Sequence, residues 1–181
     1  SDLVHIKDIV GESYEQIDAR YHNNEEITGV ASGFYDLDAK TSGFQKSDLI
    51  ILAARPSMGK TSLAMNICEN VAAGRTTSGT HTEPNPVLIF SCEMSTEALI
   101  TRMLCSAAGV PAVSIMKGTG DKQVMTKRLM RAADDLSQLP IYVDDTGGLD
   151  VMDLRACARR MHKRYGIKLI MIDYLQLLNS K

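Results

Sequence analysis

The sequence predicts an α/β fold in which a parallel β-sheet is covered by helices on both faces. Short apolar runs rich in β-branched residues alternate with longer segments in which apolar residues recur every three or four positions. The first pattern is typical of buried strands and the second of amphipathic helices. Strands separated by helices pair in parallel, and a parallel sheet is buried on both faces. The strands are expected over residues 48–53, 87–91, 141–144 and 168–173.

Length and composition are those of about one soluble globular domain. The chain has 181 residues, of which 44% are hydrophobic and 23% are charged, with a formal net charge of −2. This charge excludes a polybasic nucleic-acid tail as the main mode of action, although it allows a local basic surface. The four cysteines are widely spaced and form no CxxC pair, which argues against a zinc site and against a disulfide framework.

Neither a membrane segment nor a secretory signal is visible in the sequence. The longest strongly apolar stretch, residues 49–54, is far shorter than the roughly 18–20 residues that span a bilayer. The first residues contain neither the basic region nor the apolar region of a signal peptide. We therefore expect a cytoplasmic protein without a membrane partner.

The first helix is expected near residues 1–21 and is followed by a polar run over residues 22–26. Several of its apolar residues fall near one face at helical spacing. This stripe must be buried, either on the chain's own domain or on a neighbouring subunit. The stripe consists of Ile6, Ile9, Val10, Ile17 and Tyr21.

Four further helices connect the expected strands. Asp150 is a suitable N-cap for the last of them, and Gly166 follows its end. Residues 74–86 are rich in Gly, Thr and Pro and are expected to form a surface loop. The helices are expected over residues 60–73, 96–108, 121–136 and 151–165.

A phosphate-binding loop is predicted between the first strand and the helix that follows it. Backbone N–H groups around residues 58–62 can converge on phosphate oxygens at the positive end of the helix dipole. Lys60 would reach the β- and γ-phosphates of ATP, and the Thr61 hydroxyl would bind Mg²⁺. The alternative is a chance Gly-Lys-Thr at an ordinary strand–helix turn, since Ala54 replaces the usual first glycine. The candidate nucleotide-binding residues are Ala54, Arg55, Pro56, Ser57, Met58, Gly59, Lys60, Thr61 and Ser62.

Two acidic residues at carboxyl ends of strands complete the candidate site. Asp173 ends the apolar run 169–172 and should open on the same side of the sheet as the loop, where it can serve Mg²⁺. Its alternative role is that of a helix cap or a turn residue. Glu93 follows the strand 87–91 and can polarise the water that attacks the γ-phosphate. From spacing alone, Glu93 could equally cap the following helix.

Basic residues crowd the helix expected over residues 151–165. A solvated face is the preferred interpretation, and a nucleic-acid or subunit contact is the alternative. These residues are Arg155, Arg159, Arg160, Lys163 and Arg164. The adjacent pair Asp144 and Asp145 ends a strand near the same rim, and the pattern assigns it no role.

Several motifs together resemble the C-terminal ATPase domain of the bacterial replicative DNA helicases of the DnaB family. They are TGVASGFYDLDAKTSGFQKSDLIILAA, AARPSMGKT, FSCEMS and LIMIDYLQLL, and the likeness extends from about Ile27 to Leu178. The family normally carries Ala at the position of Ala54. Residues 1–26 are similar in position to the family's linker helix and its connector, and residues 27–181 to part of its ATPase domain.

The resemblance implies a RecA-like P-loop NTPase fold and a ring of six subunits that uses ATP and Mg²⁺. Such rings couple ATP hydrolysis to 5′→3′ movement on single-stranded DNA at the replication fork, with primase and a helicase loader as partners. It assigns the water-activating role to Glu93, which with Lys60 is the expected catalytic pair. It assigns phosphate and Mg²⁺ contacts to Lys60, Thr61 and Asp173.

The sequence departs from the family in extent. It lacks the N-terminal domain and everything after the Asp173 strand, including the sensor strand that lies in RecA-like sheets between the phosphate-loop strand and the Asp173 strand. Residues 1–181 alone are therefore expected neither to unwind DNA nor to hydrolyse ATP appreciably. The alternatives are a related RecA-like ATPase of recombination or clock type, whose loops are usually Gly-rich, and a non-catalytic assembly module.

Overall fold

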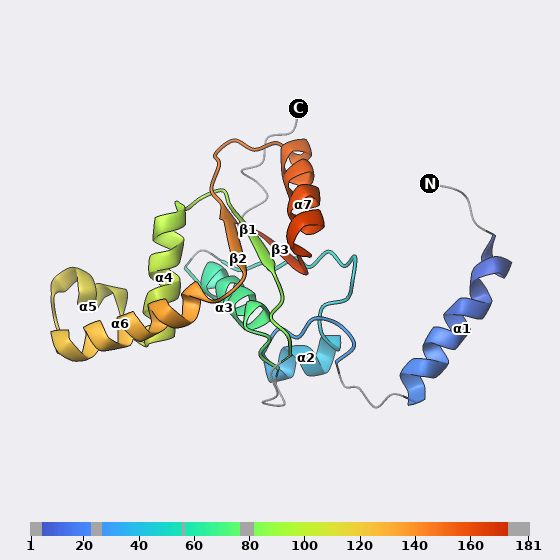
Figure 1. The fold of residues 1–181 in the computed structure, drawn as a ribbon, viewed down its shortest axis with the longest axis horizontal. Helices are drawn as coiled ribbons and strands as arrows, with labels where there is room; N and C mark the ends of the chain where they lie inside the picture. Colours follow the sequence, from blue (N-terminus) through green and yellow to red (C-terminus); the bar gives the residue numbers. More distant parts are fainter. Residues whose placement is uncertain (1–4, 23–26, 56, 77–81, 174–181) are drawn as a thin grey trace.

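The described residues fold around a three-stranded parallel sheet with strand order β2-β1-β3 (Figure 1). The computed structural model describes residues 5–22, 27–55, 57–76 and 82–173. The strands are β1 (Val87–Ser91), β2 (Ile141–Asp144) and β3 (Leu169–Asp173), close to three of the four expected ranges. In this register Phe90 lies beside Asp144 and Ser91 beside Asp173, so the carboxyl ends of the strands meet at one edge.

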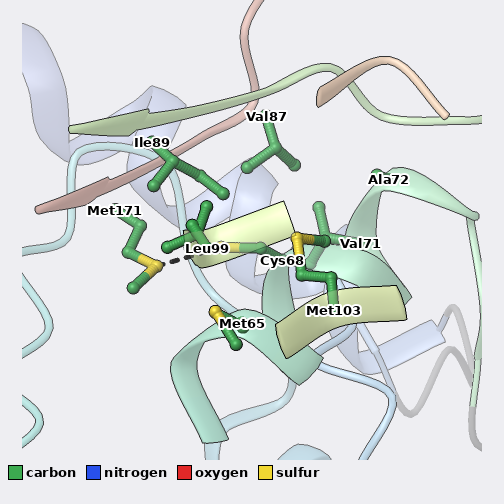
Figure 2. Close-up of a cluster of buried hydrophobic side chains, with 9 residues drawn as sticks. All are labelled: Met65, Cys68, Val71, Ala72, Val87, Ile89, Leu99, Met103 and Met171. Carbon is green, nitrogen blue, oxygen red and sulfur yellow. Dashed lines mark hydrogen bonds between the residues drawn. The ribbon is translucent and has the colours of Figure 1, made fainter. Parts of the chain in front are cut away.

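One face of the sheet packs on α3 (Lys60–Ala72) and α4 (Thr96–Ala108), and α6 (Lys122–Ser137) packs mainly on α4. The periodicity predicted all three helices within one residue at each end. Figure 2 shows the core of this face, where side chains of β1 and β3 meet those of α3 and α4. The Cys68 thiol lies 3.5 Å from the Met171 sulfur, and burial raises the pKa of this thiol to about 12. Cys68 is therefore a protonated core residue.

The opposite face packs on α7 (Val151–Tyr165), whose bounds match the expected helix. Successive residues of β1 alternate between the faces, so Leu88 and Phe90 contact α7 whereas Val87 and Ile89 belong to the first core. The predicted α/β fold with helices on both faces of a parallel sheet is thus confirmed.

Two short helices were not predicted, α2 (Tyr35–Thr41) and α5 (Ala112–Lys117). Each is too short to show a clear helical period. The segment around α2 is held by the buried Asp38, whose carboxylate accepts the Ser32 backbone N–H at 2.8 Å. The Asn70 amide of α3 donates to the Ser32 carbonyl at 3.1 Å and ties this segment to the core.

The prediction of a buried strand over residues 48–53 is wrong. These residues form no strand, and Leu49 and Ile51 are 82% and 74% exposed. A strand requires a neighbour for its backbone N–H and C=O groups. Among the described residues β3 pairs only with β1, and a cavity of about 360 Å³ is lined on one side by residues 50–54 and on the other by β3. The apolar run is present, but it has no adjacent strand to pair with.

The first helix, α1 (Ile6–His22), lies apart from the α/β body (Figure 1). Its apolar stripe is exposed to solvent, since the exposed fractions of Ile6, Val10 and Ile17 are 73%, 55% and 65%. Packing on its own domain, one of the two expected alternatives, is therefore not observed. Within the described residues, neither α1 nor any other helix combines the length and hydrophobicity needed to cross a membrane.

Candidate active site

The loop before α3 has the backbone conformation of an anion-binding turn. Gly59 is the N-cap of α3 with φ +84°, and Ser57 has φ +65°. A side chain at Gly59 would be strained, which explains glycine there. The Met58 N–H donates to the Arg55 carbonyl at 3.3 Å. No side chain caps α3 at this N-cap, which leaves the positive end of its dipole suited to phosphate.

Most of the predicted nucleotide-binding residues line one cavity of about 610 Å³. Glu93 lines the same cavity from a different element, the turn after β1. The Met58 side chain is exposed and is not part of the lining, and Pro56 lies outside the described residues. The lining residues are Ala54, Arg55, Ser57, Gly59, Lys60, Thr61, Ser62, Glu93 and Arg102.

Asp173 joins the loop to the end of β3. Its carboxylate accepts a hydrogen bond from the Thr61 hydroxyl at 2.7 Å and pairs with the Lys60 ammonium at 3.2 Å. Adjacent ligands of a six-coordinate Mg²⁺ lie about 3 Å apart, given metal–oxygen bonds of about 2.0–2.1 Å. The Thr61 and Asp173 oxygens therefore fit two positions around one Mg²⁺. In the described part of the chain no three His, Cys, Asp or Glu residues gather, so phosphate and water would supply the remaining ligands.

The sheet register brings this carboxylate close to the Glu93 turn. Ser91 of β1 lies beside Asp173 of β3, and the next residue, Cys92, donates its N–H to the Asp173 carbonyl at 2.8 Å. Burial raises the pKa of the Cys92 thiol, and the carboxylates of Asp173 and Asp144 raise it further. This thiol is therefore protonated at neutral pH and is no nucleophile.

Glu93 does not cap the helix that follows it. The N-cap of α4 is Ser95, whose hydroxyl accepts the Ala98 N–H at 3.3 Å. Glu93 precedes this cap and has an exposed side chain that lines the cavity. Its position leaves the carboxylate available to a water molecule in the cavity.

Arg102 is a member of this cavity that the sequence analysis missed. It lies on α4, between Leu99 and Met103 of the buried face, and adds a guanidinium to the charge of Lys60. No local pattern singles out this residue, because one arginine on an amphipathic helix is ordinarily a solvated side chain. The basic residues of α7 do not reach this cavity, and all five have exposed side chains, as a solvated face requires.

The sequence matches the family described as DnaB-like helicase C terminal domain over residues 29–181. The chain belongs to the DnaB-like helicase family. It is 45% identical to Replicative DNA helicase DnaB of Geobacillus stearothermophilus and 42% identical to Replicative DNA helicase DnaC of Bacillus subtilis (strain 168). These alignments cover 97% and 99% of the chain but 37% and 38% of the two relatives. The chain thus spans less than two fifths of their length.

Two solved structures share the fold. The chain is similar to one that is described as an ATPase domain, with a TM-score of 0.80 and 29% identity, over 98% of this chain and 60% of that one. It is equally similar, at the same TM-score and identity, to a DnaB-like replicative helicase described with its interactions with primase. That match covers 100% of this chain and 41% of the other. The RecA-like fold is therefore confirmed, and the recombination- or clock-type alternative is not favoured.

Proposed function

We propose that this chain is the nucleotide-binding part of a replicative DNA helicase, which couples ATP hydrolysis to 5′→3′ movement on single-stranded DNA. One observation carries the proposal: Lys60, Thr61 and Asp173 meet within hydrogen-bond distance at a cavity that Glu93 also lines. An ammonium, a hydroxyl and two carboxylates in this arrangement are what hydrolysis of a nucleoside triphosphate requires. The names of the relatives supply the link to DNA.

Each residue has a distinct proposed role. The backbone of the turn before α3 binds phosphate oxygens, and Lys60 neutralises charge on the β- and γ-phosphates. Thr61 and Asp173 would hold Mg²⁺, which when bound supplies charge neutralisation at the phosphates. Glu93 accepts the proton of the attacking water as general base. Arg102 lines the same cavity and adds positive charge where the leaving phosphate carries negative charge.

The proposed setting is a cytoplasmic, homo-hexameric ring at the replication fork, with single-stranded DNA, primase and a helicase loader as partners. A DnaB-like relative has been described with its interactions with primase, which supports that partner. The open stripe of α1 supports contact between subunits, because an apolar helix face that does not pack on its own domain is stabilised by burial elsewhere.

Charged residues in the α1 stripe should weaken assembly without unfolding the domain. Ile9→Glu and Ile17→Glu place charges on exposed positions, so the melting temperature of the α/β body should stay within about 2 °C of wild type. The mass measured by multi-angle light scattering should fall from that of a ring to that of smaller species. Glu15→Lys, on the polar face of α1, is the matched control. A ring of unchanged mass in both stripe variants contradicts docking through α1.

The decisive test of function compares the full-length protein with residues 1–181. The full-length protein should unwind a fork with a 5′ single-stranded tail in the presence of ATP and Mg²⁺. Residues 1–181 alone should show no unwinding and negligible hydrolysis, because residues 48–55 are exposed and unpaired with any described strand, so the loop is poorly fixed. Robust unwinding by residues 1–181 contradicts this expectation, and a full-length protein without hydrolysis favours the assembly-module alternative.

A further inference from the structure

The turn that carries Glu93 is fixed at several points. The Ser91 hydroxyl donates to the Met94 carbonyl at 2.7 Å, and the Cys92 N–H donates to the Asp173 carbonyl at 2.8 Å. These contacts attach the beginning of the turn to the sheet. The end of the turn is the first turn of α4, so the direction in which Glu93 projects depends also on how α4 begins.

A carboxylate from a distant segment holds that first turn. Asp145 lies in the connection between β2 and α7, and its Oδ2 accepts the Thr96 backbone N–H at 2.7 Å. Thr96 is the first residue of α4, where backbone N–H groups have no partner within the helix and negative charge is favourable. The hydrogen bonds from the backbone and side chain of Thr96 lower the pKa of Asp145, so this carboxyl is ionised at neutral pH.

This contact is more than a second helix cap. Ser95 already caps α4 from the adjacent position, just as Asp121 caps α6 and Asp150 caps α7. Asp145 instead reaches α4 from the residue that follows β2, at the edge where the carboxyl ends of β1 and β2 meet. It therefore ties the first turn of α4 to the end of β2, whereas Leu99 and Met103 pack the rest of the helix into the core.

We propose that Asp145 is a positioning residue for ATP hydrolysis, which fixes the start of α4 and thereby aims Glu93 and Arg102 into the nucleotide cavity. Glu93 immediately precedes the cap of α4 and Arg102 follows it by about two turns, so both move if α4 shifts. The inference rests on the proposed function, because it presumes that Glu93 acts on the attacking water. A shift of about 1 Å in such a group can lower a rate by as much as about 100-fold.

The experiment measures ATP hydrolysis and nucleotide affinity in variants of the full-length protein. Asp145→Ala should lower kcat by about tenfold while KM and the Kd for a fluorescent ATP analogue stay within about twofold of wild type. Asp145→Asn keeps an oxygen acceptor for Thr96 and should restore most of kcat. Asp121→Ala, which removes an exposed cap from α6, should leave kcat unchanged and controls for loss of a cap.

Thr96→Pro removes the donor instead of the acceptor. Proline is favoured at the first helical position, and Ser95 has φ −65° and ψ 152°, an extended conformation that proline allows in the preceding residue. This variant should reproduce the tenfold loss of kcat, and the double variant with Asp145→Ala should lose no more than either alone.

The outcomes separate the two proposals. If Glu93→Gln hydrolyses ATP normally, the proposed role of Glu93 is wrong. The positioning role of Asp145 is overturned if Glu93→Gln is inactive but Asp145→Ala has the kcat of wild type. It is also overturned if Asp145→Ala loses no more kcat than Asp121→Ala does. Fully additive losses in the Asp145→Ala and Thr96→Pro double variant overturn it as well. The positioning role is supported if Asp145→Ala, Thr96→Pro and their double variant lose kcat to the same extent and Asp145→Asn restores most of it.

Discussion

Lys60→Ala is expected to lower ATP hydrolysis by the full-length protein by about 100-fold or more. The Lys60 ammonium lies 3.2 Å from Asp173 and lines the proposed nucleotide cavity, where it would meet the charge that develops on the transferred phosphate. Removal of one preorganised donor of this kind typically costs about 10²–10³ in kcat. Phosphate release in the presence of Mg²⁺ and single-stranded DNA measures the effect.

Lys122→Ala is the matched control for this variant. Lys122 is an exposed lysine at the start of α6 and does not line the cavity. It should hydrolyse ATP as wild type does. Circular dichroism and melting temperature should show that Lys60→Ala is folded, because Asp173 keeps its hydrogen bond from Thr61. Hydrolysis at the wild-type rate in folded Lys60→Ala would falsify the assignment of the phosphate-binding loop.

Glu93→Gln should separate ATP binding from hydrolysis. The amide retains the size and hydrogen-bonding reach of the carboxylate but cannot accept a proton from water. A general base typically contributes about 10²–10⁴ to a rate, so kcat should fall by that factor. The Kd for ATP should stay near that of wild type, because the phosphate contacts are assigned to the loop and Lys60 and not to Glu93. Stopped-flow binding and single-turnover hydrolysis measure the two quantities separately.

Glu97→Gln makes the same chemical change on the exposed first turn of α4. It lies outside the cavity lining and should leave both binding and hydrolysis unchanged. If Glu93→Gln loses ATP binding while its fold is intact, Glu93 has a structural role and does not act on water.

Local sequence patterns were sufficient for most elements of the fold. The three strands among the described residues are short apolar runs bounded by turn residues. Helix α7 begins after its N-cap Asp150 and ends before Gly166, as its capping residues predict. The same patterns placed Lys60, Thr61 and Asp173 at one edge, because carboxyl ends of parallel strands share an edge. These inferences require only the sequence within a few residues of each position and the general geometry of parallel sheets.

The features that escaped prediction depend on contacts between distant segments. The run 48–53 has the composition of a strand, but strand formation depends on a neighbour that no local pattern can supply. Asp145 was assigned no role because its partner, the Thr96 N–H, belongs to the backbone of a helix from a different part of the chain. Arg102 was missed for a similar reason, since only the packing of α4 against the sheet brings it to the cavity.

The pairing of β1 with two later strands has a consequence for the order of folding. Val87 pairs with Ile141 and with Leu169, so the central strand is synthesised well before either neighbour. Parallel pairing over such separations is slow, because the entropy of closing long loops is lost before any pairing is gained. The predicted phosphate loop and α3 are synthesised before Asp173, which ends the last described strand. Tight ATP binding with Mg²⁺ should therefore be acquired late in biosynthesis, and until β3 is made one edge of β1 stays unpaired.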